Sequence, residues 1–327
     1  MATALEHQAP AVRQGHRTRS CGVGGRTLLV LVAGAMVLAG VGMAGLTTDR
    51  DGSGGGGEFG HARHTAQPIT PDASTMTTQP RSATPSSLSR ATPNRMPLTS
   101  TPGFLIRQLA WEGATRNYVV YVPPAHVFAN GELPERVPLI VFLHGRGECG
   151  TDGMEQLGVG LGPAIMRNVA AWPFIVLFPQ KPAANDRWSQ HGPMVMAMLE
   201  ATRAEAPIDD ERTYLTGISQ GGLGTWDLAA ASPRTWAAIA PVCGWSGAEH
   251  AEKIRAIPTW AFHGEADSVI RSEETERSIE ALRRALQPGD PEPRMTIYPG
   301  VDHNSWDRAY RDEGLGAWFL GHRRRGT

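Results

Sequence analysis

The stretch that decides the fold is YLTGISQGG, residues 214–222. An apolar run suited to a β-strand ends in Gly-Ile-Ser-Gln-Gly, and a glycine-rich helical segment follows at once. This order predicts a nucleophile elbow, a sharp strand-to-helix turn that holds Ser219 at its apex. Gly217 and Gly221 suit such a turn, since no Cβ has to fit beside the crowded serine. With 38 glycines in 327 residues the pentapeptide alone is a weak signal, so the surrounding segments must support it.

The segments around the elbow alternate between short apolar runs and helical patterns. A β-hairpin is predicted from residues 104–110 and 117–122, and further strands are predicted at 139–143, 174–178, 237–241, 258–262 and 295–298. Helices are predicted at 154–169, at 193–204, from the elbow to just before Pro233, and from about Ser272 onward. This alternation predicts one α/β domain, with a mainly parallel sheet and helices on both faces.

Two of the loops that follow predicted strands carry the residues that a serine nucleophile needs. Asp267 and His303 both come after the elbow, in the chain order Ser, Asp, His of this class of hydrolase. The carboxyl ends of parallel strands share one rim, so Ser219, Asp267 and His303 are expected to meet there. His303 would accept the serine proton, and Asp267 would orient the imidazole. Glu265 and Asp302 remain alternatives for the acid.

The same rim offers groups that could contact a substrate. The backbone N–H of Gln220 and that of Arg146, in the turn HGRGE (residues 144–148), are the expected oxyanion donors. Trp188 and Trp245 are predicted to lie in loops near the rim, where they are candidates for the substrate pocket. Packing in the core explains each of these indoles equally well.

The chain has three cysteines, Cys21, Cys149 and Cys243. They form no Cys-x-x-Cys pair and show no zinc-binding spacing, so neither a metal nor a cofactor is expected. Cys149 and Cys243 each follow a predicted strand near the rim. A disulfide between them and two free thiols are both open at this point.

The first 102 residues lack the composition of a folded domain. Residues 1–27 are basic, and residues 28–46 are uncharged and just long enough to cross a bilayer. An uncleaved membrane anchor, which we favour, and the apolar region of a cleaved signal peptide both fit, and either would export the rest of the chain. Residues 47–102, rich in Gly, Ser, Thr and Pro, predict a disordered linker. Residues 103–327 are then the catalytic domain.

Five motifs together resemble a known family: FLHGRGE (142–148), the elbow with GTW (224–226), AIAPVCG (238–244), WAFHG (260–264) with Asp267, and YPGVDHNSW (298–306). They are similar to the bacterial phospholipase/carboxylesterase group of α/β hydrolases, which is related to polyhydroxybutyrate depolymerases and feruloyl esterases. The resemblance spans about residues 103–322. It implies an α/β-hydrolase fold and gives Ser219, Asp267 and His303 the triad positions. Gln220, where methionine is usual, and Cys149, where arginine is common, depart from the family pattern.

These observations predict an exported serine carboxylesterase that acts through an acyl-enzyme on small or polysaccharide-linked esters. A peptidase or amidase with the same triad is one alternative. A carbohydrate- or cell-wall-binding module that keeps the fold without turnover is another. The near balance of 31 Lys and Arg against 32 Asp and Glu gives no reason to expect a nucleic acid as partner.

Overall fold

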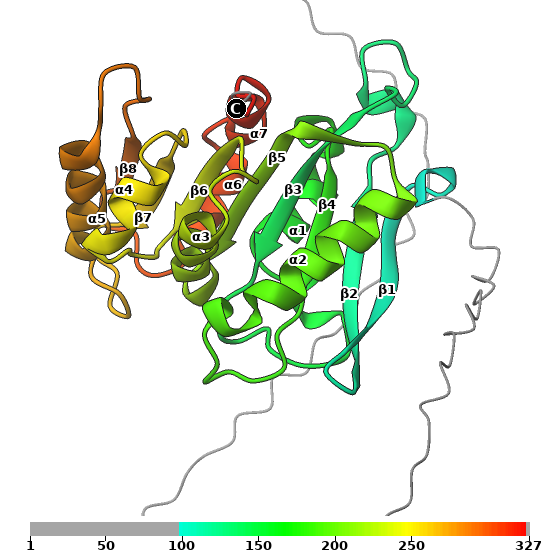
Figure 1. The fold of residues 1–327 in the computed structure, drawn as a ribbon, viewed down its shortest axis with the longest axis horizontal. Coiled ribbons are helices and arrows are strands. Elements are labelled where there is room, and N and C mark those ends of the chain that lie inside the picture. The colour runs from blue at the N-terminus through cyan, green and yellow to red at the C-terminus, as the bar shows by residue number, and fades with distance from the viewer. Residues whose placement is uncertain (1–97, 325–327) are drawn as a thin grey trace, which may run out of the picture. The chain divides into compact units, whose positions relative to one another are not determined.

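The computed structural model describes residues 98–324 of the chain. Within them eight strands form one sheet in the order β1-β2-β4-β3-β5-β6-β7-β8 (Figure 1). β1 (Gly103–Trp111) and β2 (Ala114–Val122) pair antiparallel, and β2 pairs antiparallel with β4 (Ile175–Pro179). All the other neighbours in the sheet are parallel. The predicted hairpin and the predicted α/β fold with a mainly parallel sheet are therefore confirmed.

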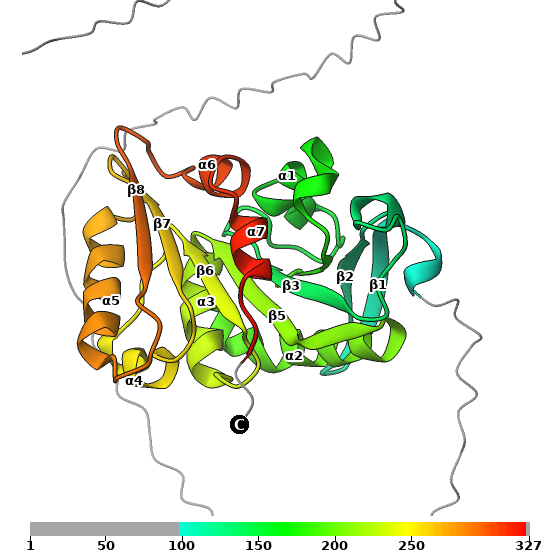
Figure 2. The same ribbon diagram turned by 90° about the horizontal axis from the view of Figure 1, so that it is seen from above.

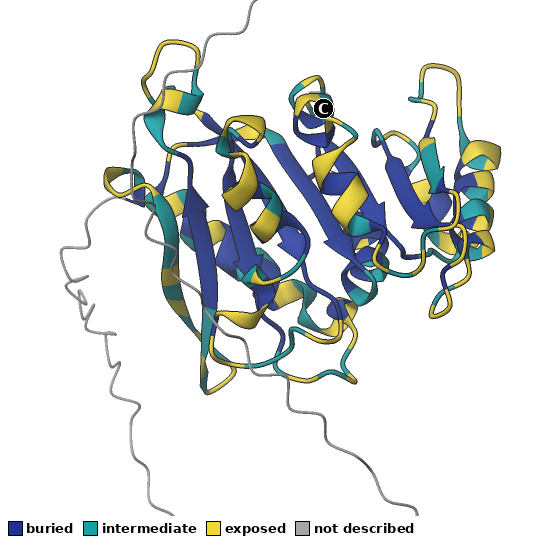
Figure 3. Ribbon diagram, turned by 180° about the vertical axis from the view of Figure 1, so that it is seen from behind, coloured by how far each residue is buried: buried dark blue, intermediate teal, exposed yellow. Residues whose placement is uncertain are grey.

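The remaining strands are β3 (Val137–Leu143), β5 (Ile208–Ile218), β6 (Ala238–Val242), β7 (Trp260–Gly264) and β8 (Arg294–Tyr298). The strands predicted after the hairpin are confirmed, and outside β5 their bounds shift by two residues at most. In β3, Leu139 and Val141 face one core, whereas Ile140 and Phe142 face the other. Because both faces of the sheet are covered, every second residue packs against a different layer, and the strand is apolar throughout (Figure 3).

Helices cover both faces of the sheet (Figures 1 and 2). One face packs against α2 (Trp188–Glu205), α3 (Gln220–Ala231), α4 (Ala251–Ile254) and α5 (Ser272–Ala285). The other face packs against α1 (Leu161–Arg167), α6 (Trp306–Arg311) and α7 (Leu315–Leu320). Short 3₁₀ turns are η1 (Leu98–Ser100), η2 (Ala125–Val127), η3 (Glu155–Leu157), η4 (Val169–Ala171) and η5 (Ala248–His250).

Two helix predictions need correction. The continuous helix predicted at 154–169 is wrong, because α1 covers only its middle and 3₁₀ turns flank it. Gly160, just before α1, has φ +68° and lies against the ring of Phe142, and an α-helix cannot continue through that backbone conformation. The helix predicted at 193–204 instead begins at Trp188 and runs through Pro193. Trp188 therefore opens a helix and does not lie in a loop, and its indole is buried in the core beneath α2.

The predicted basic tail, the apolar segment 28–46 and most of the predicted linker lie outside the described residues. The last part of that linker is described from Leu98, whose side chain is buried in the core. Among the helices of residues 98–324, none combines the length and the apolar composition that a membrane span requires.

Candidate active site

Ser219 lies at a close-packed turn between β5 and α3. Its backbone adopts φ 53° and ψ −118°, a conformation that residues with a side chain rarely adopt, and its N–H donates to the carbonyl of Val242 (3.0 Å). A Cβ on Gly221 would collide with the carbonyl oxygen of Leu143, and one on Gly217 would collide with the backbone of Gly221. The glycines predicted to flank the serine are thus required by backbone contacts on both sides of the turn.

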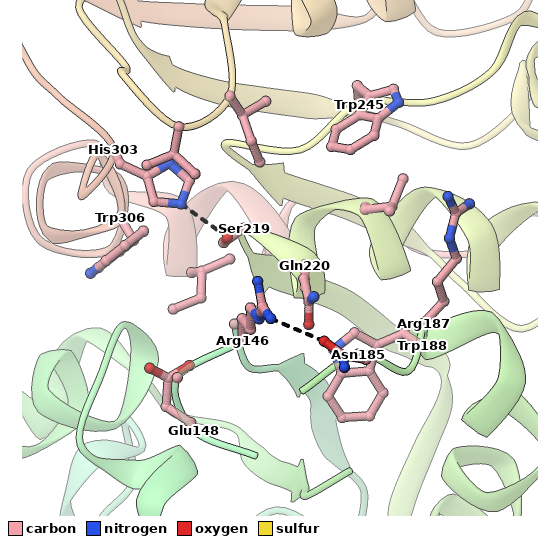
Figure 4. Close-up of a pocket in the computed structure, with 16 residues that line it drawn as sticks. Arg146, Glu148, Asn185, Arg187, Trp188, Ser219, Gln220, Trp245, His303 and Trp306 are labelled. Atoms are coloured by element: carbon pink, nitrogen blue, oxygen red, sulfur yellow. Dashed lines mark hydrogen bonds between the residues drawn. The ribbon is translucent and has the colours of Figure 1, made fainter. Parts of the chain in front are cut away.

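The structure brings Ser219, His303 and Asp267 into one hydrogen-bonded chain. His303 Nε2 lies 2.9 Å from Ser219 Oγ (Figure 4), and His303 Nδ1 lies 2.7 Å from Asp267 Oδ2. A carboxylate only accepts, so Nδ1 carries the proton and the lone pair of Nε2 faces the serine hydroxyl. The imidazole is held in the tautomer that can take a proton from Ser219.

Asp267, in the loop after β7, is held by four hydrogen bonds. Its Oδ1 accepts from the backbone N–H groups of Val269 and Ile270, both at 2.8 Å. Its Oδ2 lies 3.0 Å from His263 Nε2 in addition to its contact with His303. The side chain has no exposed area. A buried carboxylate with this many donors is fixed in position and does not have to reorient when charge develops on His303.

The two alternative acids serve other groups. Glu265 accepts from the backbone N–H of Gly300 (3.0 Å). Asp302 accepts from the backbone of Ser268 (2.8 Å) and of His303 (2.7 Å), and these hydrogen bonds, the one from Ser268 first, hold the pKa of Asp302 below its usual range. Among the described residues, neither carboxylate contacts the His303 ring. Their hydrogen bonds instead hold the loops after β7 and β8 in position.

The two predicted oxyanion donors lie on either side of Ser219. Gln220 is the first residue of α3, so no carbonyl of its own helix can reach its N–H, and the helix dipole favours negative charge at that end. The turn that contains Arg146 lies against the serine, since a Cβ on Gly145 would be 3.5 Å from Ser219 Cβ. Donation by these two amides to a reacting carbonyl stays a prediction.

A pocket of 520 Å³ opens over Ser219 (Figure 4). One part of its wall is apolar, formed by Trp245, Val269, Ile270 and Trp306. The opposite part is polar, formed by Arg146, Glu148, Asn185, Arg187 and Gln220. A pocket of this size and mixed character suits an ester with an apolar and a polar portion.

Both predicted pocket tryptophans line this cavity, in different ways. Trp245 lies half-buried in the loop after β6. Trp188 is 1% exposed, and its Nε1 donates to the carbonyl of His144 (3.0 Å). Trp188 therefore also supports the turn before Arg146 from below. A role for either indole in substrate binding stays a prediction.

Several lining residues were not singled out as pocket residues from the sequence. Val269 and Ile270 come two and three residues after Asp267, and Trp306 comes three residues after His303. Asn185 and Arg187 lie between β4 and α2. Each segment follows the carboxyl end of a parallel strand, and that position was the signal that could have identified them.

His144 shapes the turn beside the serine. It is fully buried, its Nδ1–H donates to the carbonyl of Gly145 (2.7 Å), and its Nε2 accepts from the backbone N–H of Lys181 (3.1 Å). Burial, with a smaller contribution from the charge of Lys181, lowers the pKa of His144 to about 4. The neutral ring ties the turn to the loop after β4 and has no free nitrogen to act as a second base.

The structure leaves Cys149 and Cys243 as free thiols. Cys149 Sγ lies 3.0 Å from Nζ of Lys181, whereas Cys243 is buried and burial raises the pKa of its thiol to about 12. Ligand atoms of Cys243, Asp267 and His303 lie within 4.8 Å of one another, a group that could hold a metal ion. A neutral thiol is a poor ligand, and His303 and Asp267 already bind each other. The donor set therefore fits a metal poorly.

Comparisons with known proteins point to one group of enzymes. The family model described as Phospholipase/Carboxylesterase matches residues 163–312. A bifunctional acetylxylan esterase/xylanase from Neocallimastix patriciarum is 26% identical over 54% of this chain and 26% of that protein. Feruloyl esterase B from Neurospora crassa is 25% identical over 55% of this chain and 63% of the relative. The chain thus spans less than two thirds of these relatives.

Solved structures share the fold. The crystal structure of a thermostable esterase is 29% identical, with a TM-score of 0.59 over 68% of this chain and 63% of that one. A feruloyl esterase module from Clostridium thermocellum, 18% identical, has a TM-score of 0.50 over 68% of this chain and 89% of that chain. The second likeness supports the arrangement of strands and helices alone.

Proposed function

We propose that this protein is a serine esterase with Ser219, His303 and Asp267 as its catalytic triad, since its fold is that of solved esterases and part of its sequence matches the Phospholipase/Carboxylesterase family model. The observation that carries the proposal is the hydrogen-bonded chain from the Ser219 hydroxyl through His303 to the buried Asp267 carboxylate. The hydrogen-bonded triad ends at a pocket of 520 Å³, which is large enough for an ester.

The mechanism follows from these positions. Ser219 Oγ attacks the ester carbonyl while its proton moves to His303 Nε2, and Asp267 stabilises the imidazolium that forms. The N–H groups of Gln220 and Arg146 donate to the tetrahedral oxyanion. His303 then passes the proton to the departing alkoxide oxygen, and the alcohol leaves an acyl group on Ser219. Water, deprotonated by His303, attacks this acyl-enzyme and releases the acid.

We further propose that the natural substrates are carboxylic esters of small alcohols or of polysaccharides. Two relatives are named as an acetylxylan esterase and a feruloyl esterase, which supports acetyl and feruloyl esters as substrates to test. The apolar part of the wall, with Trp245 and Trp306, suits an acyl or aryl group. Hydrolysis of an anilide matched to the best ester would instead support the peptidase alternative.

We also propose that the catalytic domain is exported. The order of a basic tail, the apolar segment 28–46 and the polar linker 47–102 supports an anchored domain at the end of a tether. Fractionation of cells with and without the apolar segment, followed by N-terminal sequencing of the product, distinguishes an anchor from a cleaved signal. Catalytic domain that stays in the cytoplasm with residues 1–46 intact would contradict export.

Ser219→Ala tests the proposed chemistry. We expect hydrolysis of p-nitrophenyl acetate, p-nitrophenyl butyrate and methyl ferulate to fall at least 10³-fold, since the nucleophile is removed while binding groups remain. Labelling by a fluorophosphonate should disappear as well. Ser232→Ala, at the far end of α3, is the matched control and should keep both activities. Undiminished turnover in the Ser219→Ala protein would refute the mechanism.

A further inference from the structure

The polar wall of the pocket carries positive charge that the protein compensates only in part, through the electrostatic interaction of Arg187 with Asp227. Arg146 and Arg187 both line the pocket, and neither forms an ion pair with any residue in the described part of the chain. Arg146 is held by a neutral group, because its Nη2 donates to Oδ1 of Asn185 (3.0 Å). Figure 4 shows this contact on the side of the pocket toward Arg187. Two guanidinium groups therefore face the space that a substrate enters.

The acidic residue of the lining does not offset these charges. Glu148 lies on the opposite side of Arg146 from Asn185 (Figure 4), with its side chain 16% exposed. Burial raises the pKa of Glu148, which favours its neutral form relative to an exposed carboxyl. Its Oε2 is buried without a hydrogen-bond partner among the described residues. An incoming substrate therefore meets more positive than negative charge at this wall.

We propose that the site selects esters that carry a carboxylate, with Arg146 and Arg187 as the specificity-determining residues. This inference rests on the proposed esterase function and names its substrate class. A guanidinium binds a carboxylate through two parallel N–H donors, and this pairing is stronger in a pocket that is partly shielded from water. The indoles of Trp245 and Trp306 hold the apolar remainder of the ester on the opposite wall.

The carboxylate has two chemical sources, the acid part of the ester and its alcohol part. Mono-p-nitrophenyl glutarate, compared with its methyl ester, places the charge on the acyl side. 4-Carboxyphenyl butyrate, compared with its methyl ester, places the charge on the leaving group. In each pair the reacting bond is the same, and intrinsic differences in reactivity between the two esters cancel when the ratio of their kcat/KM values is compared between the wild type and a variant.

The experiment measures these ratios for the full-length wild type and for Arg146→Gln, Arg187→Gln and the double variant. We expect at least one ratio to fall about 3- to 10-fold in the double variant, and to fall in the wild type as salt is raised. Arg284→Gln, on the exposed surface of α5, is the control for net charge and should leave the ratios unchanged. Thermal melting verifies that each variant is folded.

The outcomes separate the two proposals. Ratios that are the same in the wild type and the double variant, with turnover that depends on Ser219, overturn the carboxylate preference and leave the esterase proposal standing. Absence of Ser219-dependent turnover on all four esters overturns the esterase function and the preference with it. A ratio that falls in only the acyl pair or only the leaving-group pair identifies which part of the natural ester carries the acid.

Discussion

The two sides of the catalytic rim differ in how much room the backbone leaves. On the elbow side, a Cβ on Gly221, Gly222 or Gly244 would collide with the backbone of a neighbouring strand or helix. Across the pocket, a Cβ on Gly147 would meet no atom within 4 Å, and the neighbouring Arg146 side chain is exposed. The reacting atoms are thus fixed by backbone packing, whereas the wall that faces the substrate can change its side chains without disturbing the fold.

The same contrast holds for charge. On the elbow side, the Asp267 side chain has no exposed area and all its hydrogen bonds come from within the protein. On the substrate side, Arg146 and Arg187 are exposed and free of ion pairs among residues 98–324. A substitution on the first side should therefore affect catalysis or folding severely, and one on the second should adjust specificity.

The largest effect is expected from Asp267→Asn. The amide oxygen of the variant would keep the hydrogen bonds from the backbone N–H groups of Val269 and Ile270, so its NH2 group would face His303 Nδ1 and force the other imidazole tautomer. We therefore expect kcat for p-nitrophenyl butyrate to fall about 10⁴-fold with the fold intact. Asp302→Asn is the matched control. Its carboxylate is exposed and binds the loop backbone and the Ser268 hydroxyl, not the His303 ring, so its loss should cost tenfold or less. If kcat fell equally in the two variants, the buried Asp267 would not be the acid that orients His303, and the proposed contrast with the exposed Asp302 would be wrong.

A large effect on stability is expected from Gly221→Ala. The added methyl group has to displace the strand that carries Leu143, which should lower the free energy of unfolding by about 3 kcal/mol or more. Gly147→Ala, in the open turn, should change it by less than about 0.5 kcal/mol. Urea unfolding of both variants measures the difference. If the Gly221 variant were as stable as the Gly147 variant, close packing of the elbow would not be what fixes the serine.

Much of this architecture could be predicted from the sequence, because the signals are local. The fully apolar runs marked strands covered on both faces, and the elbow pentapeptide marked the turn at Ser219. The order of Asp267 and His303 after strand ends was enough to expect that they meet, and the structure puts them at hydrogen-bond distance. The choice of Asp267 over Asp302 depended on how many residues separate each acid from the end of the preceding strand. The sequence gives that number only as well as it predicts where the strand ends.

What could not be predicted depends on contacts between distant segments. The break before α1 arises because Gly160 lies against Phe142, a residue of β3, and no local pattern reports that contact. α2 begins at Trp188 because its indole is buried and bonds to His144, 44 residues earlier in the chain. That Arg187 lines the same pocket as Arg146 was also hidden, since the segments that carry them come together only once β3 and β4 lie side by side.

A smaller effect on stability is expected from pH at the junction between the two sides, where His144 ties the exposed turn to the buried loop at Lys181. In the unfolded chain the imidazole binds a proton below about pH 6.5, whereas in the folded protein it does so only near pH 4. Between these values the unfolded state binds more protons, so stability is full above pH 6.5 and falls as the pH is lowered.

On lowering the pH from 7.5 to 5, this one group should cost the wild type about 2 kcal/mol in the free energy of unfolding. His144→Gln removes the titrating ring, so its loss over the same interval should be smaller by that amount, although the variant starts less stable at pH 7.5. His126→Gln, which removes an exposed histidine, should follow the wild type. Urea unfolding at the two pH values measures all three proteins. If the wild type and the His144 variant lost the same free energy of unfolding between pH 7.5 and 5, the turn beside the serine would not exclude water from the imidazole. The contrast between the two sides of the rim would then rest on backbone packing alone.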